Sequence, residues 1–296
     1  SDALLREANP QVRLFPDEAD AAAPARLDGD LAIRTARLEW RRAAHMAGQI
    51  RNPTYRSEYL DRAVENMAVG SATIALEYTG SAPSGRESTL TDEQRELFSS
   101  LADQILEEGA ELAQAIERPI WRNRAMERLA SAAGESGQYE RATDLANRIQ
   151  NAEARCRALV LVAEFQARKN RNEEATRSYM LAAEAAASVQ QRGLRGVLVG
   201  ILIDSLVSTG RFEDARSSLV LYSSDAERFV AMGAIAESLG VRRMADEARE
   251  WIERDVPAQY RSTLFRRLNN GMLRAISEDR ARDFQGGREP EPARVD

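Results

Sequence analysis

An arginine recurs at near-regular intervals along the 296-residue chain, and each one opens a segment with helical periodicity. Three of these segments carry a proline just before the arginine, at Pro53, Pro119 and Pro257, which suits the first turn of a helix. The intervals between successive arginines are 66, 33, 37, 36 and 33 residues, and the first is twice 33. Such a period predicts helical units stacked along the chain rather than one globular core. The six arginines are Arg56, Arg122, Arg155, Arg192, Arg228 and Arg261.

A second set of residues runs in step with the arginines. Glycine or asparagine falls between paired helical segments, and alanine follows five residues later. Glycine and asparagine tolerate the left-handed backbone conformation that ends a helix, and small side chains let two helix axes approach closely. We therefore expect four hairpins with equivalent turns. The predicted turn residues are Gly137, Asn170, Gly210 and Gly240, and the predicted small residues are Ala142, Ala175, Ala215 and Ala245.

The composition favours an all-helical chain. Hydrophobic residues make up 43% and aromatic residues only 6%, and no apolar–polar alternation is long enough for a strand. We expect a helical-repeat domain over residues 31–283, with its clearest repeats in 119–255. Residues 1–30 are predicted to be a flexible arm, residues 80–90 a loop insertion, and residues 284–296 a disordered tail.

The recurring arginine, turn and alanine positions resemble the tetratricopeptide repeat, a helix–turn–helix unit of about 34 residues. We call each set of equivalent positions a column, so the six arginines form the arginine column. The resemblance implies an all-α fold, a right-handed superhelical array of antiparallel helix hairpins (an α-solenoid) with roughly five to six units. The array is degenerate, because the first-helix position that holds a large aromatic residue in the family holds Met126, Leu159, Val199 and Phe229 here. The best-matching unit contains Met126, Leu129, Ala130, Gly137, Tyr139, Ala142 and Ile149.

In this family the first helices of the units line a concave groove that binds a segment of a partner protein. The resemblance therefore implies a non-enzymatic scaffold whose partner is another protein or peptide. Mixed charge with an acidic excess in the groove suits a basic or mixed partner segment; the alternative is an ordinary solvated face. A lysine-rich clamp for a terminal carboxylate is not expected, because Lys169 is the only lysine. The groove residues implied are Arg124, Glu127, Glu164, Arg168, Asp204 and Glu237.

Single residues exclude several chemistries. His45 is the only histidine and Cys156 the only cysteine, so an intrachain disulfide and a zinc site built from several Cys and His are excluded. We expect no catalytic residue, no cofactor and no metal. Cys156 lies between Arg155 and Arg157, so it is either a thiol with a lowered pKa or a small buried residue.

Two clusters of charge leave alternatives open. The arginine column either binds anions as a ladder or pairs with carboxylates of adjacent units, as Glu117 would with Arg122. Glu107, Glu108 and Glu111 lie about one turn apart on one predicted helix. Paired carboxylates suit acid–base or metal chemistry, but glycosidases usually bring such groups together from different elements.

Two other functions stay open beside the scaffold. One is an enzyme or catalytic helper with an unrecognised carboxylate–arginine site. The other is a self-associating envelope or assembly factor, a homo-oligomer built through apolar residues of the last unit: Leu264, Phe265, Leu268, Met272 and Leu273.

The charge and hydropathy of the chain bear on its partners and location. The net charge of −6 argues against general nucleic-acid binding. The sequence contains no run of about 18 apolar residues, which is the length needed to span a membrane. We expect a soluble cytoplasmic or periplasmic protein, and the first residue, Ser1, leaves open a preceding signal or lipid anchor. The preference for arginine over lysine is typical of a GC-rich, bacterial genome.

Overall fold

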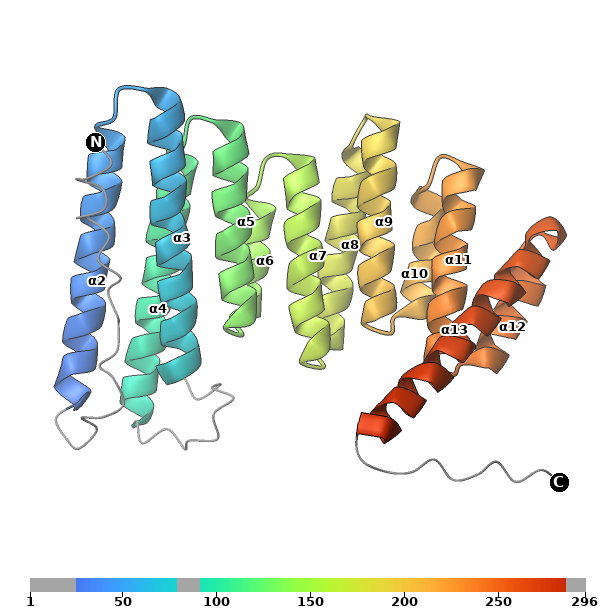
Figure 1. Ribbon diagram of the computed structural model, residues 1–296. Coiled ribbons are helices and arrows are strands. Elements are labelled where there is room, and N and C mark those ends of the chain that lie inside the picture. Colours follow the sequence, from blue (N-terminus) through green and yellow to red (C-terminus); the bar gives the residue numbers. More distant parts are fainter. Residues whose placement is uncertain (1–24, 79–90, 286–296) are drawn as a thin grey trace. The chain divides into compact units, whose positions relative to one another are not determined.

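The computed structural model describes residues 25–78 and 91–285, which are almost entirely helical (Figure 1). These ranges contain twelve α-helices and no β-strand, so the all-α prediction is confirmed. A short 3-10 segment, η2 (Leu219–Leu221), extends α10. The α-helices are α2 (Ala25–Gly48), α3 (Pro53–Tyr78), α4 (Asp92–Gln114), α5 (Pro119–Glu135), α6 (Tyr139–Asn147), α7 (Ala152–Arg168), α8 (Asn172–Ser188), α9 (Arg192–Ser208), α10 (Phe212–Ser218), α11 (Asp225–Val241), α12 (Ala245–Asp255) and α13 (Ala258–Gln285).

The predicted arm, loop insertion and tail fall largely outside the described residues. Residues 25–30 belong to α2, so the arm predicted over 1–30 ends too late. Residues 284 and 285, assigned to the tail, continue α13. The loop predicted over 80–90 lies outside the described residues. Among the helices described, none has both the length and the apolar character needed to cross a bilayer.

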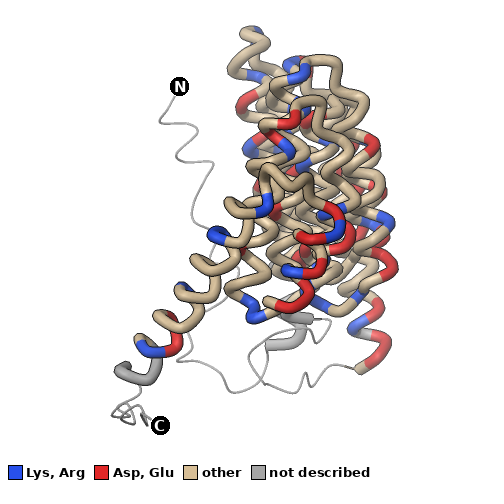
Figure 2. Tube along the Cα trace, turned by 90° about the vertical axis from the view of Figure 1, so that its right-hand side faces the viewer, with Lys and Arg blue, Asp and Glu red and all other residues tan. Residues whose placement is uncertain are grey.

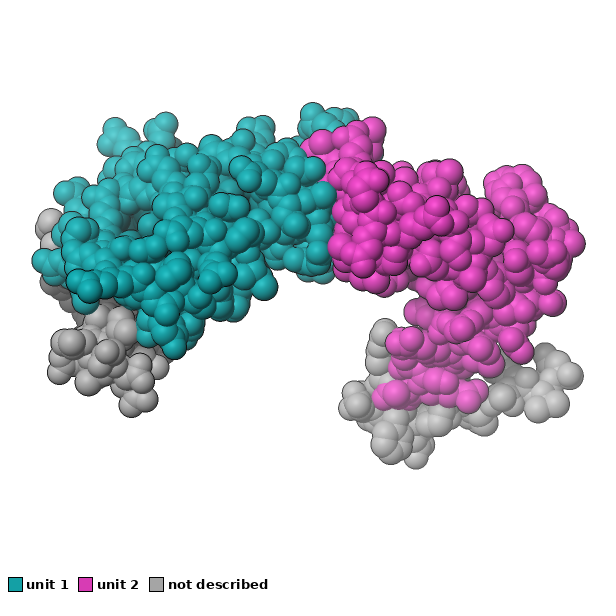
Figure 3. All heavy atoms as spheres, turned by 90° about the horizontal axis from the view of Figure 1, so that it is seen from above, with its two compact units in different colours: residues 1–178 teal, residues 179–296 magenta. Residues whose placement is uncertain are grey.

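The chain divides into two compact units, residues 1–178 and 179–296, with the boundary inside α8 (Figure 3). In the first unit, α3 packs on α2, α4 and α5, and α5 packs on α6 and α7. In the second unit, α9 packs on α10 and α11, and α11 packs on α12 and α13. Helices thus pack mainly on their neighbours in sequence. The single repeat domain expected over 31–283 stays a prediction.

Four turns between paired helices share one hydrogen-bond pattern. In each, one residue has a positive φ, and its backbone N–H bonds the carbonyl three residues earlier at 3.0–3.2 Å. The next residue donates its N–H to the carbonyl five residues earlier at 2.8–2.9 Å. This pair of bonds is the Schellman motif, which satisfies carbonyls left free at a helix end. The positive-φ residues are Gly137, Asn170, Gly210 and Arg243.

The fourth turn corrects the sequence prediction by three residues. Gly240 lies inside α11, and Arg243 adopts the left-handed conformation with φ of 61°. Ala248 therefore replaces Ala245 as the small residue five positions after the turn, and Ala248 is fully buried. The first three turn residues are as predicted, and so are the fully buried alanines that follow them: Ala142, Ala175 and Ala215.

The arginine column needs a similar correction in α9. The backbone N–H of Arg195 bonds the carbonyl of Gln191, as that of Arg155 bonds Asn151, so Arg195 rather than Arg192 is the equivalent residue. Each arginine then precedes its turn residue by 15 positions in all four hairpins. The pairs are Arg122 with Gly137, Arg155 with Asn170, Arg195 with Gly210, and Arg228 with Arg243.

The corrected register also aligns the core of each hairpin. The residue eight positions before the turn and the residue seven positions before it are at most 1% exposed in every hairpin. Burial at the same two positions indicates that each first helix turns the same face inward. These residues are Leu129 and Ala130, Val162 and Ala163, Leu202 and Ile203, and Ile235 and Ala236.

Gly240 serves a helix crossing rather than a turn. A Cβ atom placed on Gly240 of α11 would lie 2.2 Å from the carbonyl oxygen of Leu268 in α13. A Cβ atom on Gly271 of α13 would lie 2.0 Å from the carbonyl oxygen of Glu237 in α11. The two backbones are therefore in direct contact at a point that admits only glycine on both helices.

The shared turn predicts opposite effects for two glycine-to-alanine substitutions with open space around the new Cβ. Gly137→Ala should lower the free energy of unfolding by about 1–2 kcal/mol, because Gly137 has φ of 82° and the penalty comes from the backbone alone. Gly48→Ala at the end of α2 should raise it by about 0.5 kcal/mol, because Gly48 has ordinary helical φ. Urea unfolding followed by circular dichroism measures both. A stabilised Gly137→Ala variant would contradict the turn assignment.

Candidate functional site

The arginine column does not pair mainly with carboxylates of adjacent units. Four of its members donate a guanidinium N–H to the backbone carbonyl of a residue one or two positions after the end of the preceding helix. Such a residue lies outside the helical hydrogen bonds, so the guanidinium supplies a partner for its carbonyl. The bonds run from Arg56 to Ile50 at 3.1 Å, Arg155 to Ile149 at 3.1 Å, Arg228 to Tyr222 at 3.2 Å, and Arg261 to Val256 at 2.8 Å.

Two members of the column differ. Arg195 donates instead to the hydroxyl of Ser223, at 3.0 Å. Arg122 makes no such bond, and Glu117, its expected partner, pairs with Arg56. The predicted Glu117–Arg122 ion pair is therefore wrong, and neither an anion-binding ladder nor a row of interunit ion pairs describes the column.

The predicted groove residues on α5 are engaged with the neighbouring first helices. Arg124 Nε lies 3.8 Å from the Oδ2 atom of Asp61 in α3, and its guanidinium stacks 5.5 Å from the Trp121 ring. Glu127 Oε1 accepts from Arg157 of α7 at 2.9 Å. These charges link α3, α5 and α7, so much of their hydrogen-bonding capacity is already used.

Asp61 is the most buried charge on this side of the first unit, at 1% exposed. Its Oδ2 atom accepts from Arg128 at 3.0 Å, while Oδ1 has no hydrogen-bond partner among the described residues. Burial raises the pKa of Asp61, although Arg128 and Arg124 oppose that shift. The raised pKa shows that the two arginines do not fully offset the cost of removing this carboxylate from water.

The other four predicted groove residues lie on three different helices. Glu164 and Arg168 pair with each other at 3.0 Å along α7. In the second unit, Glu237 of α11 pairs with Arg267 of α13 at 3.1 Å. Burial raises the pKa of Asp204 on α9. No single surface formed by all six residues is assigned, because they are divided between the two units.

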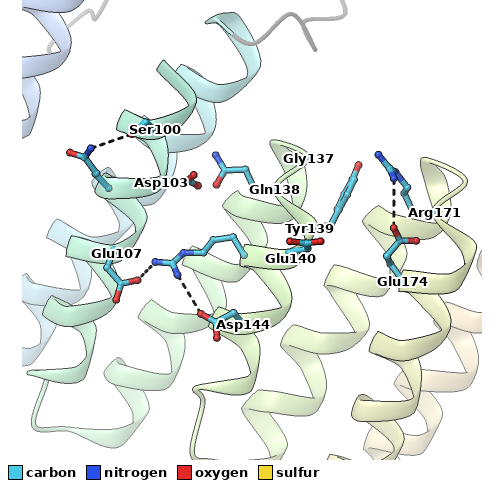
Figure 4. Close-up of a pocket in the computed structure, with 12 residues that line it drawn as sticks. Ser100, Asp103, Glu107, Gly137, Gln138, Tyr139, Glu140, Asp144, Arg171 and Glu174 are labelled. Atoms are coloured by element: carbon cyan, nitrogen blue, oxygen red, sulfur yellow. Dashed lines mark hydrogen bonds and ion pairs between the residues drawn. The ribbon is translucent and has the colours of Figure 1, made fainter. Parts of the chain in front are cut away.

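A broad groove of about 840 Å³ lies instead on the second helices of the first unit. Charged residues of both signs recur along the helices (Figure 2), but the groove lining is mainly acidic. Figure 4 shows the lining side chains, which come from α4, α6, α8 and the turns before α6 and α8. Because α6 has only nine residues, it leaves the flanking surfaces of the longer α4 and α8 exposed. The lining residues are Ser100, Asp103, Gln104, Glu107, Gly137, Gln138, Tyr139, Glu140, Arg141, Asp144, Arg171 and Glu174.

Ion pairs fix one side of this groove. Glu107 of α4 pairs with Arg141 of α6, and it also accepts from Arg148 at 3.0 Å. Asp144 accepts from Arg148 at 3.2 Å and from Arg141 at 3.4 Å. This network ties α6 to α4, so the groove has a fixed wall.

Other groove groups lack partners within the part of the chain that the structure describes. Asp103 and Glu140 are exposed and make no hydrogen bond or ion pair there; partial burial of its carboxylate raises the pKa of Asp103, although Arg141 opposes that shift. Both polar atoms of the Gln138 side-chain amide are shielded from solvent and unbonded. Asp103 projects from α4 toward the turn that carries Gln138 (Figure 4). A ligand in the groove would meet the unpaired Asp103 carboxylate directly, and it would reach the Gln138 amide once that side chain turned toward the groove.

The remaining sequence candidates are separated from one another. Glu108 binds Arg37 and Arg41 of α2, whereas Glu107 faces α6, so the two adjacent carboxylates do not converge. His45 is exposed and contacts Gln49 of its own helix at 3.0 Å. Within the described ranges no three His, Cys, Asp or Glu residues are arranged to hold a metal ion.

The apolar residues proposed for self-association are mostly packed. Leu264 and Leu268 are at most 1% exposed, while Leu273 is 62% exposed. Phe265 and Met272 are half-buried. Because the inward-facing members already have partners in the chain, this set does not form a continuous exposed apolar column.

The sequence reasoning missed the second-helix groove. Tyr139 was identified only as a repeat position, and Asp103 and Gln138 were not singled out. One signal was present, because only 18 residues separate Gly137 from the next arginine, Arg155, which limits α6 to a short helix.

Cys156 is predicted to be unreactive in the folded protein. It is fully buried, and burial raises the pKa of its thiol to about 11 despite the neighbouring Arg157. A thiol-reactive chromophore at pH 8 should modify none of the folded chain and one thiol per chain in denaturant, since the sequence has one cysteine. Rapid labelling of the folded chain would contradict this burial.

Comparison with known proteins gives no assignment: no family model matches the chain, and no curated protein is significantly similar to it.

Proposed function

We propose that the hairpins form a degenerate tetratricopeptide-like solenoid and that the protein is a non-enzymatic scaffold that binds a segment of a partner protein. Four turns with the same hydrogen bonds, each 15 residues after its arginine, support the repeat. Helical hairpins of this kind bury their apolar faces by stacking, and the stacked helices present long surfaces suited to extended ligands.

The single observation that carries the binding proposal is the unsatisfied Gln138 amide in the second-helix groove. Buried polar groups of folded proteins nearly always have a hydrogen-bond partner. An extended peptide offers both a backbone N–H and a carbonyl, which match the Oε1 and Nε2 atoms of Gln138. The groove is wide and open, as suits a chain segment rather than an enclosed small substrate.

The charge of the groove favours a basic segment. Its lining has five carboxylates and two guanidinium groups, a net charge of −3, and Arg148 just outside reduces this to −2. Glu140 and Glu174 lie in the first turns of α6 and α8, where they offset the helix dipoles. Asp103 has no such role, so it is the carboxylate best placed to receive an arginine or lysine of the partner.

The second-helix groove replaces the first-helix face as the proposed binding surface. On the first-helix face, Arg124, Glu127 and Glu237 already contact residues of neighbouring helices. A partner would have to compete with those ion pairs. Asp103 and Gln138 offer free bonding capacity without that competition.

The test uses a fluorescein-labelled, extended ten-residue peptide rich in arginine and an acidic peptide of the same length. The basic peptide should bind the full chain, more weakly as salt rises from about 50 to about 200 mM, because the attraction is screened. Asp103→Lys should weaken binding roughly tenfold through like-charge repulsion. Gln138→Ala should also weaken it. Fluorescence anisotropy measures each dissociation constant.

The matched control is Glu253→Lys, the same change of charge at an exposed α12 residue outside the groove. It should leave the dissociation constant within about twofold of wild type, apart from the long-range effect of net charge. Equal loss of affinity in Asp103→Lys and Glu253→Lys would contradict the groove assignment. So would equal binding of the acidic and basic peptides.

A further inference from the structure

Arg195 replaces the backbone-carbonyl bond of the arginine column with a bond to Ser223, whereas Arg122 has no replacement. Its counterparts Arg56 and Arg155 each bind the carbonyl six residues earlier, at 3.1 Å. The corresponding carbonyl for Arg122 belongs to Ile116, and the bond is not formed. The Arg122 side chain makes no hydrogen bond or ion pair with any described residue, although it is half-buried. None of its nitrogen atoms is shielded from solvent, so the guanidinium is hydrated and free to bind an anion.

The Arg122 side chain lines a pocket of about 380 Å³ in the first unit. The pocket lies between the end of α4, the start of α5 and the end of α6, and it shares no lining residue with the second-helix groove. Its volume is within the range of small-molecule sites. The lining residues are Gln114, Arg122, Asn123, Met126, Arg148, Ile149 and Gln150.

The charges that line this pocket favour a ligand with a single negative charge. Arg148 is already compensated by Glu107 at 3.0 Å and by Asp144 at 3.2 Å. Arg122 has no carboxylate partner within the described residues, so the pocket has one uncompensated positive charge. The lining contains no acidic side chain that would repel an anion.

The uncharged lining distinguishes between kinds of anion. The side-chain amides of Gln114, Asn123 and Gln150 supply additional N–H donors for an oxyanion. Met126 and Ile149 contribute a small apolar area to the pocket wall, since they are 3% and 2% exposed. A fully hydrated inorganic anion gains nothing from such surface, whereas a short hydrocarbon chain does.

We infer that this pocket binds a carboxylate monoanion that carries a short aliphatic chain. The planar guanidinium of Arg122 matches the two oxygens of a carboxylate, and the chain packs on Met126 and Ile149. The carboxylate belongs either to a free small acid or to the side chain of a glutamate in a bound peptide. The site is independent of the proposed scaffold function, because it uses different residues from the groove.

Thermal unfolding of the full chain with three probes tests the inference, with sodium chloride keeping ionic strength constant. The probes are butyrate, the glutamate side-chain mimic N-acetylglutamic acid α-amide, and inorganic phosphate. At about 20 mM, butyrate or the glutamate mimic should raise Tm by roughly 2–4 °C, because a ligand that binds only the folded state stabilises it. The larger shift identifies a free acid or a peptide side chain as the source. No shift with either carboxylate, or a larger shift with phosphate, would overturn the inference.

Two arginine substitutions make a matched pair. Arg122→Gln should abolish the carboxylate-induced shift and leave the Tm without ligand nearly unchanged, since Arg122 has no partner to lose among the described residues. Arg261→Gln should lower the Tm without ligand, because it loses the bond to the carbonyl of Val256, and should keep the carboxylate-induced shift because neither residue lines the pocket. Retention of the shift in Arg122→Gln, or its loss in both variants, would refute the assignment of the site.

Discussion

The contact on which the hairpin arrangement depends is a guanidinium bound to the carbonyls that end the preceding helix. An arginine in the first turn of a helix opposes the dipole of that helix, which is unfavourable in isolation. Here the arginine instead binds a carbonyl just after the previous helix, as Arg155 binds Ile149 and Arg261 binds Val256. One side chain thus links the first turn of a helix to the residues that follow the helix before it.

The spacing of this contact explains how the chain tolerates an insertion. The next arginine of the column follows its turn residue by 18 positions for Gly137, Gly210 and Arg243. It follows Asn170 by 25 positions. The seven additional residues lengthen α8 by about two helical turns, which returns the following chain to nearly the same helix face. In α9 the residues eight and seven positions before the turn are buried, as they are in α7.

Much of the fold follows from the sequence, and the errors have physical causes. Periodicity and the arginine spacing predict the helices and three of the four turns. Gly240 misled the prediction because glycine serves both tight turns and close helix crossings, and only its contact with Leu268 shows which role applies. Arg192 was chosen over Arg195 although a shift of three would have matched the 40-residue interval between Asn170 and Gly210.

The candidate sites were much less predictable. The second-helix groove combines side chains from three helices, and its shape depends on the short α6, so no local pattern marks it. The Arg122 pocket was hidden for a different reason. Arg122 and Arg155 occupy the same position of the repeat, and the missing bond to the carbonyl of Ile116 separates them. Sequence periodicity reports the positions that repeat, whereas both sites depend on contacts between helices that the period does not specify.

Native-state hydrogen exchange at the four turns tests the hairpin register most directly. The amides of Gln138, Arg171, Arg211 and Met244 each donate to a carbonyl five residues earlier. Each should exchange at least about 100-fold more slowly than an unprotected amide, while residues 245–247, in the first turn of α12, should exchange fast. Fast exchange at Met244, with the unprotected amides at residues 242–244 instead, would place the fourth turn at Gly240 and contradict the common hairpin.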